Sequence, residues 1–159
     1  MKRLASNGGF SLVELLTVII IMGILMALVV YSVNKWLPNM QIAGASQQLL
    51  GAVGQARLTA ATKSALVKLE LFRPDSFIIT RKAPWDTVFA GGIWIRQGSG
   101  RLQNGVQFIL RNDPETYDFW RDGSLQAIPA QQPQIQCIRK PSLIRSLFVM
   151  RSTGLAEIR

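Results

Sequence analysis

Histidine is absent from this sequence of 159 residues, and cysteine occurs only once. Without histidine the chain lacks the most common general base and the most common metal ligand. The single cysteine, Cys137, excludes an intramolecular disulfide and a cysteine-based zinc site. Because it stands in an alternating apolar segment, we expect it to be a small buried side chain in a strand. These absences argue against a histidine-dependent enzyme and against a disulfide scaffold.

Other motifs that would carry chemistry are also lacking. The glycine clusters, Gly91–Gly92 and Gly98-Ser99-Gly100, lack the strand-to-helix setting and the Lys-Ser/Thr of a phosphate-binding loop, so we interpret them as turns. Four carboxylates surround a proline-containing turn and an alternating strand, and we expect exposed turn acids there rather than calcium ligands: Asp113, Glu115, Asp118 and Asp122. The sequence therefore predicts no enzyme, no metal site, no cofactor and no small-molecule substrate.

One apolar run, from Phe10 to Tyr31, raises the hydrophobic share of the chain to 48%. As a helix it would extend about 33 Å, enough to cross the hydrocarbon core of a bilayer. A secretory signal peptide would carry its small residues after the apolar region, whereas Gly8–Gly9 precede it. A simple signal anchor explains the basic start at Lys2-Arg3. It does not explain Glu14, since a carboxylate at the bilayer centre costs about 2.5–3.5 kcal/mol.

The segment Gly9-Phe10-Ser11-Leu12-Val13-Glu14 resembles the class III signal of type IV pilins and type II secretion pseudopilins. The resemblance implies that a prepilin peptidase cuts between Gly9 and Phe10 on the cytoplasmic side and that the new Phe10 amine is N-methylated. It also implies that the apolar helix is retained as the assembly spine. Glu14 would then meet the terminal amine of a neighbouring subunit, or that of its own subunit one helical turn away. Many family members carry a proline near the end of this run, whereas the first proline here is Pro38.

Beyond Pro38 the hydrophobic period changes. Ile42, Ala45 and Leu49 begin a spacing of three and four that continues through Val53, Ala56 and Ala60, as in an amphipathic helix. Pro38 either begins this second helical stretch or bends one long helix. We therefore divide the chain into a leader (residues 1–9), a transmembrane helix (10–37), an amphipathic helix (38–63) and a β-rich head (64–159).

The head shows short alternating segments separated by turn residues, which predicts antiparallel strands. The expected strands cover residues 65–72, 77–80, 93–95, 106–110, 117–120, 135–138 and 147–150, and residues 128–133 are expected to form an exposed loop. The predicted fold class is α+β, with a long N-terminal transmembrane and amphipathic helix followed by an antiparallel, sandwich-like head.

Three later segments resemble the GspH/FimT group of minor subunits: Gln55-Ala56-Arg57-Leu58-Thr59-Ala60-Ala61, Phe119-Trp120-Arg121-Asp122-Gly123 and the stretch from Leu147 to Gly154. The resemblance implies a minor pilin or pseudopilin at or near the tip of a type II secretion pseudopilus or a type IV pilus. It would cross the bacterial inner membrane once, with its head in the periplasm. Its partners would be other pilins through the helix, the prepilin peptidase and membrane lipid.

The net charge of +9 leaves one alternative open. Arginine is favoured for phosphate contacts, and some FimT-type members are linked to DNA uptake. The alternative is therefore a minor pilin that binds double-stranded DNA in natural transformation, with these candidates: Arg139, Lys140, Arg145 and Arg151. Such members carry a Gly-Arg-x-Arg run near the C-terminus, and the corresponding segment here, Gly154-Leu155-Ala156-Glu157-Ile158-Arg159, does not match it. The charge would otherwise serve solubility, anionic headgroups or acidic neighbours.

Overall fold

The computed structural model describes residues 10–83, 85–89, 91–127, 129 and 131–159. Over these residues one helix, α1 (Leu12–Lys63), is followed by strands only. The strands are β1 (Val67–Phe72), β2 (Ser76–Arg81), β3 (Ile95–Arg101), β4 (Val106–Ile109), β5 (Glu115–Phe119), β6 (Gln134–Cys137), β7 (Ile144–Val149) and β8 (Ala156–Ile158). The chain forms two compact units, divided between Leu37 and Pro38, and α1 runs through both.

The first unit is the apolar part of α1. Every side chain from Phe10 to Trp36 is exposed. This part of the helix is long and apolar enough to cross a membrane, with a mean hydropathy of 2.8 over its most apolar window and no burial there. Pro38 lies inside α1 rather than at the start of a second helix, so one long helix is the alternative that the structure adopts.

The second unit contains the rest of α1 and the head. The spacing of three and four predicted one buried face, and that face is confirmed: Ile42, Ala45, Leu49, Val53, Ala56 and Ala60 are all buried. Cys137 is a free, buried cysteine at the end of β6, also as expected. Small alanines along this face let the sheets approach the helix axis closely.

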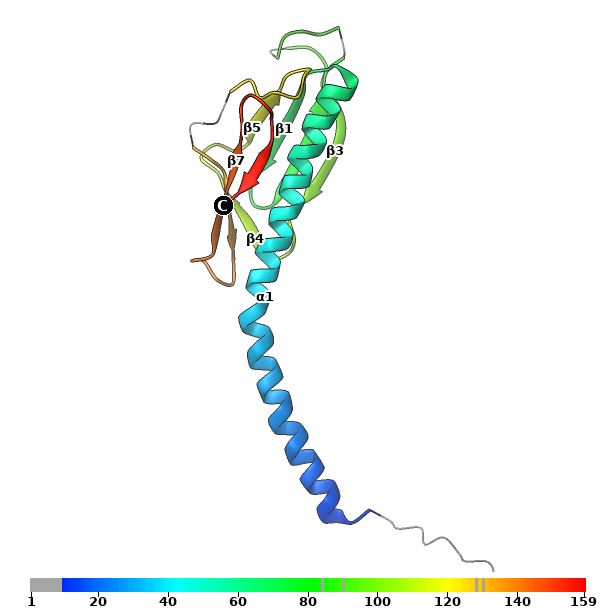
Figure 1. The fold of residues 1–159 in the computed structure, drawn as a ribbon, viewed down its shortest axis with the longest axis vertical. Helices are drawn as coiled ribbons and strands as arrows, with labels where there is room; N and C mark the ends of the chain where they lie inside the picture. Colours follow the sequence, from blue (N-terminus) through cyan, green and yellow to red (C-terminus); the bar gives the residue numbers. More distant parts are fainter. Residues whose placement is uncertain (1–9, 84, 90, 128, 130) are drawn as a thin grey trace, which may run out of the picture. The chain divides into compact units, whose positions relative to one another are not determined.

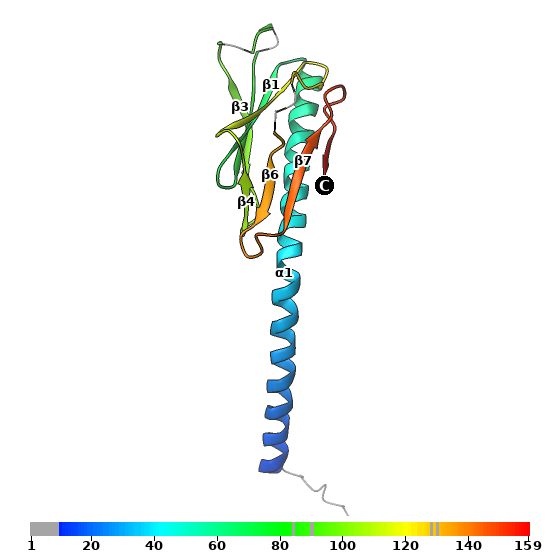
Figure 2. The same ribbon diagram turned by 90° about the vertical axis from the view of Figure 1, so that its left-hand side faces the viewer.

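The strands form two antiparallel four-stranded sheets, in the orders β3-β2-β1-β5 and β4-β6-β7-β8 (Figures 1 and 2). On β1 the buried Val67, Leu69 and Leu71 alternate with Lys68 and Glu70. A single hydrophobic core includes residues from α1 and both sheets. Burial of each aliphatic side chain in this core stabilises the fold by about 1.5–3 kcal/mol. The predicted α+β class with an antiparallel head is therefore confirmed.

Two turns close over the helix where Arg57 lies. The backbone adopts positive φ at Gly123 (84°) and Gly154 (64°). A β-carbon on Gly154 would lie 2.1 Å from the carbonyl oxygen of Gly123 and 3.3 Å from Cδ of Arg57. One on Gly123 would lie 3.0 Å from Cγ of Arg57. Both turns therefore require glycine, because of their backbone conformation and because no space remains for a side chain.

The strands and loops of the head differ from the expectation at several places. Gly98-Ser99-Gly100, interpreted as a turn, lies inside β3. A β-carbon on Gly100 would lie 2.5 Å from the ring of Phe77 on β2, so this glycine serves close packing between strands rather than chain reversal. Strand β8 was not expected, and residues 93–94 precede β3. In the expected loop at 128–133, Pro133 is buried, and residues 128 and 130 lie outside the described residues.

The four carboxylates expected as exposed turn acids have different environments. Asp113 contacts Arg73 at 3.4 Å, and Asp122 accepts hydrogen bonds from the backbone and hydroxyl of Ser124 at 2.9 and 2.7 Å. For Glu115 the expectation of an exposed acid was wrong, because this residue is only 6% exposed. Its carboxylate accepts a hydrogen bond from the Asn112 N–H at 3.2 Å. It lies on the inward face of β5, which the sequence did not distinguish from the turn before it. Burial raises the pKa of Asp118.

A buried lysine anchors the long connection between β2 and β3. Lys82 is 0% exposed, and its Nζ lies 3.0 Å from Oδ2 of Asp86 and donates to the Val88 carbonyl. Arg121 donates to the Asp86 carbonyl at 3.0 Å. Because a buried ammonium needs such partners, these contacts hold the connection against the head. Nothing in the sequence distinguishes Lys82 from the other basic residues of the head.

Acidification is expected to loosen this connection. The hydrogen bond from Lys82 holds the pKa of Asp86 below its ordinary value of 3.8. A carboxyl whose pKa is depressed on folding stabilises the fold above its unfolded pKa, and that contribution is lost as pH falls below about 3.8. Trp94, whose ring lies 5.1 Å from Nζ of Lys82, reports the change by fluorescence. Asp86→Asn should produce the same emission change at neutral pH.

Glu157→Gln is the matched control, because Glu157 also has a lowered pKa but lies on β8, where it pairs with Arg159. Its emission should follow that of the parent chain. An Asp86→Asn variant with parental emission at neutral pH would show that Asp86 does not hold the connection.

Candidate processing and assembly segment

The predicted processing and assembly residues lie where α1 begins. Gly9 lies outside the described residues. Phe10 is 81% exposed and directly precedes the helix. Glu14 lies in the first turn, is exposed, and takes part in no ion pair among the described residues. Its carboxylate is therefore available to a positive group near the helix start, where the helix dipole favours negative charge.

Ser11 caps this helix, a role that the sequence analysis did not identify. The N–H of Glu14 donates to Oγ of Ser11 at 3.2 Å, and the Ser11 carbonyl accepts from the N–H groups of Glu14 and Leu15. Ser11-Leu12-Val13-Glu14 has the Ser-x-x-Glu pattern of a capping box, a signal that the sequence alone contains. Ser11 and Glu14 therefore suit the start of a helix, and this role is independent of assembly.

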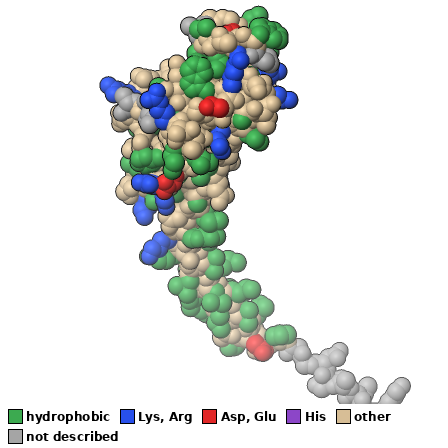
Figure 3. Space-filling view, turned by 45° about the horizontal axis from the view of Figure 1, so that its top comes forward, with side chains coloured by type: hydrophobic (Ala, Val, Ile, Leu, Met, Phe, Trp, Pro, Cys, Tyr) green, Lys and Arg blue, Asp and Glu red, His purple; other side chains and the backbone are tan. Residues whose placement is uncertain are grey.

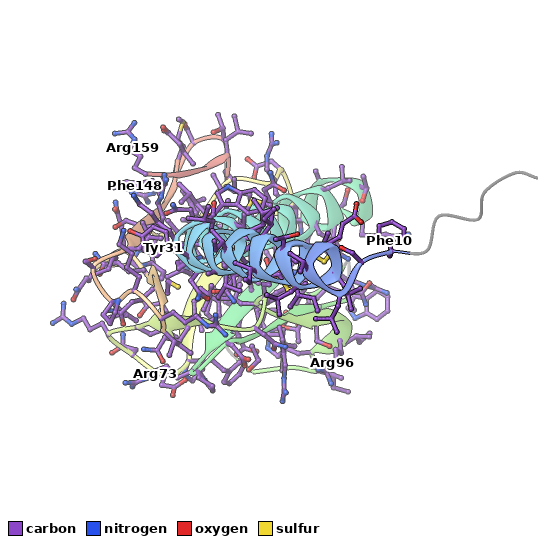
Figure 4. All side chains as sticks on the ribbon, turned by 90° about the horizontal axis from the view of Figure 1, so that it is seen from below. Phe10, Tyr31, Arg73, Arg96, Phe148 and Arg159 are labelled. Atoms are coloured by element: carbon purple, nitrogen blue, oxygen red, sulfur yellow. The ribbon has the colours of Figure 1, made fainter. Side chains whose placement is uncertain are left out.

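The helix surface after Glu14 has the character of a lipid or helix interface. Figure 3 shows hydrophobic side chains over this part of the chain. Figure 4 shows Tyr31 projecting from it and Phe10 at the point where the chain enters the helix. All its large apolar side chains are exposed within the described chain. So large an apolar surface marks an interaction site, and a bilayer or a bundle of similar helices would cover it.

The four candidates for DNA binding do not all lie together. Arg139 and Lys140 lie in the turn between β6 and β7, and Arg145 lies near the start of β7, opposite Ile135. Arg151 lies in the turn between β7 and β8, at the other end of β7 (Figure 1). Six residues of extended chain span about 20 Å. The structure therefore groups the first three and separates the fourth.

The C-terminal arginine is engaged within its own head. Arg159 pairs with Glu157 at 3.0 Å and lies over the Phe148 ring at 5.3 Å, and Figure 4 shows Arg159 beside Phe148. Elsewhere on the face in Figure 3 the Lys and Arg side chains are dispersed among other residues. Over the part of the chain that the structure describes, no three histidine, cysteine or carboxylate residues group as a metal site requires.

Comparisons with known proteins bear on the N-terminal segment and on the fold. The family model described as the prokaryotic N-terminal methylation motif matches residues 4–30. A comparison with curated protein sequences found no match. A crystal structure of the type IV minor pilin FimU from Pseudomonas aeruginosa strain PAO1 is similar, with a TM-score of 0.51 and 14% identity. That match covers 79% of this chain and 90% of that chain.

The methylation motif, the long apolar helix and the antiparallel head together define a type IV pilin-like protein. Within that class, the fold is the one seen in a minor pilin. The expected resemblance to type IV pilins is thereby confirmed. Membership of the GspH/FimT group stays a prediction.

Proposed function

We propose that this chain is a minor pilin or pseudopilin that acts by assembly and binding rather than by catalysis. Its precursor is cut between Gly9 and Phe10, the Phe10 amine is methylated, and the apolar helix stays in the inner membrane. The head lies in the periplasm. The observation that carries the proposal is that the methylation motif at residues 4–30 coincides with the first part of α1, where every side chain from Phe10 to Trp36 is exposed.

The first helical turn supplies the contact that sets the register between subunits. Cleavage creates a positive amine at Phe10, and a carboxylate at Glu14 in the membrane costs about 2.5–3.5 kcal/mol when it is central and unpaired. Pairing Glu14 with the amine of a neighbouring subunit removes this cost, and close packing between helices provides the remaining attraction in lipid. Such a subunit joins a type II secretion pseudopilus or a type IV pilus at or near its tip.

Mass spectrometry of the mature protein tests the processing. In a host with a prepilin peptidase we expect the chain to begin at Phe10 and to carry one additional methyl group on its amine. The same host without the peptidase is the control and should yield the chain with residues 1–9 attached. An intact leader in both hosts would mean that the segment is a simple signal anchor.

Binding to double-stranded DNA across a salt series separates the assembly role from DNA uptake. Only three of the four candidates lie together, which allows few simultaneous phosphate contacts, so we expect binding to be absent at about 0.15 M salt. Submicromolar binding at that salt with a steep log-log slope would instead favour uptake, as would its loss in Arg139→Glu. Arg159→Glu is the control, because Arg159 already pairs with Glu157 on the surface of the head.

A further inference from the structure

One edge of the first sheet is open, and this is the edge formed by β3. In the order β3-β2-β1-β5, β3 is an end strand, and it is outermost in Figures 1 and 2. It spans Ile95–Arg101, and five of its seven residues are exposed. An end strand presents the backbone N–H and C=O groups that point away from its neighbour, and these accept an added strand.

The other three edges are short or already bonded. On β5 the Asp118 carbonyl accepts from the N–H of Gln126 at 2.8 Å. On β4 the N–H of Phe108 donates to the Pro74 carbonyl at 2.6 Å. Strand β8 has only three residues. Among the described strands, β3 is therefore the edge with the length and the freedom to pair with another chain.

The outer face beside this edge is positively charged. Arg96 lies opposite Thr80 on β2, and Arg101 lies opposite Ser76. Both project to the face away from buried Ile79, because side chains alternate along a strand. Neither arginine belongs to an ion pair among the described residues, and β3 contains no acid.

A shallow groove of about 460 Å³ lies between the arginines, lined by Phe72, Ile78, Ser99 and both Arg96 and Arg101. No carboxylate is among the described residues that line it. Apolar and hydroxyl groups thus form its wall, with a positive charge at each end. An occupant that carries negative charge at matching positions would satisfy both arginines.

We propose that β3 and this groove bind an extended acidic segment of another polypeptide by strand addition. The partners of Arg96 and Arg101 on β2, Thr80 and Ser76, are four positions apart, because the pairing shifts between Ile79 and Thr80. An added strand would therefore carry two carboxylates four residues apart, about 13 Å along the strand. Backbone hydrogen bonds supply attraction, and the arginines select the acidic strand.

The positive charge of this edge excludes two segments of the same protein as the added strand. A second copy of β3 would place its own arginines close to Arg96 and Arg101. Like charges placed opposite each other across an interface oppose association. The leader, residues 1–9, carries Lys2 and Arg3 and no acid. The occupant is consequently a different, acidic segment. The surface belongs to the head, so the proposal stands independently of processing at Phe10.

A tethered strand tests the proposal in the full chain, purified in detergent micelles. The heptapeptide Thr-Glu-Val-Thr-Val-Glu-Thr is fused after Arg159 through a flexible Gly-Ser linker of about 20 residues, which reaches about 25 Å. Tethering raises its effective concentration to the order of millimolar. A matched fusion carries Lys at both Glu positions. Amide hydrogen exchange of residues 95–101 is then measured.

We expect the Glu fusion to slow exchange along β3 about tenfold more than the Lys fusion, which corresponds to about 1.4 kcal/mol. In the double variant Arg96→Glu/Arg101→Glu the preference should reverse to the Lys fusion. The control variant Lys63→Glu/Arg111→Glu changes two exposed basic residues outside β3 and should leave the preference unchanged. The reversal also shows that the double variant is folded.

Three outcomes would overturn the proposal. Equal protection by both fusions would mean that charge does not select the strand. No protection by either fusion would mean that the edge does not accept a strand. Protection of the same amides by a single-stranded DNA 12-mer, with none by the Glu fusion, would assign the arginines to a nucleic acid instead.

Discussion

Replacing Glu14 with glutamine is expected to reduce incorporation of the chain into filaments about tenfold or more, while processing at Phe10 continues. Glutamine has the same length and still fits the Ser-x-x-Glu/Gln capping pattern, so the first turn of α1 is retained. The variant lacks only the charge. A hydrogen bond between charged groups contributes about 1.5–3 kcal/mol, and every 1.4 kcal/mol is a factor of about ten in association. The amount of variant in sheared filaments, relative to the parent, measures the effect.

Ser11→Ala is the matched control for this experiment. It removes the Oγ that accepts from the Glu14 N–H and costs the helix start about 0.5–2 kcal/mol, but it keeps the carboxylate. We expect it to enter filaments far better than Glu14→Gln. Parental incorporation of Glu14→Gln, with Phe10 confirmed as its first residue, would mean that Glu14 serves the helix cap and not the contact between subunits.

Substituting Gly154 with alanine is expected to destabilise the head by about 2–4 kcal/mol. The added methyl group would lie 2.1 Å from the Gly123 carbonyl oxygen, and the backbone is held at a φ of 64°. Relief requires the two turns to separate above Arg57. Thermal unfolding of the purified chain in detergent, followed through the tryptophans of the head, should show a transition lower by roughly 10 °C.

Gly51→Ala also adds one methyl group but is expected to stabilise the protein, and it serves as the control for Gly154→Ala. Gly51 is exposed on α1, and its β-carbon would meet no atom within 4 Å. Alanine in a helix interior is favoured over glycine by about 0.5–1 kcal/mol, so the transition should rise slightly. If Gly154→Ala leaves the transition unchanged, the turns are not packed as the structure has them.

Much of the fold followed from hydrophobic spacing. The face from Ile42 to Ala60 repeats at three and four residues, and the alternation from Val67 to Leu71 repeats at two, so both could be predicted by local geometry alone. β3 could not, because its Gly98 and Gly100 have the composition of a turn. In the structure Gly100 packs against the ring of Phe77 on the neighbouring strand, and Gly98 lies near the side chain of Gln55 on α1. Both contacts join residues that are distant in the sequence, so local composition does not predict them.

The candidate functional residues, too, could be predicted from the sequence only in part. Phe10 and Glu14 are recognisable because the signal is contiguous: a cleavage site, an apolar run and one acid at fixed distances. Lys82 was not recognisable, because nothing in its neighbours shows that a lysine there is buried against Asp86 and Trp94. The grouping of Arg139 with Arg145, and the separation of Arg151, depended likewise on where the ends of β7 lie.

The sequence by itself determined the anchor, the helical spine and the antiparallel class of the head, because periodicity and a contiguous motif are local properties of a chain. The tertiary structure alone decided which glycines allow close packing, which charges are buried and which strand ends a sheet. Each of these depends on residues that are distant in sequence and meet only in the folded head. The open edge at β3, with Arg96 and Arg101 beside it, is one such property.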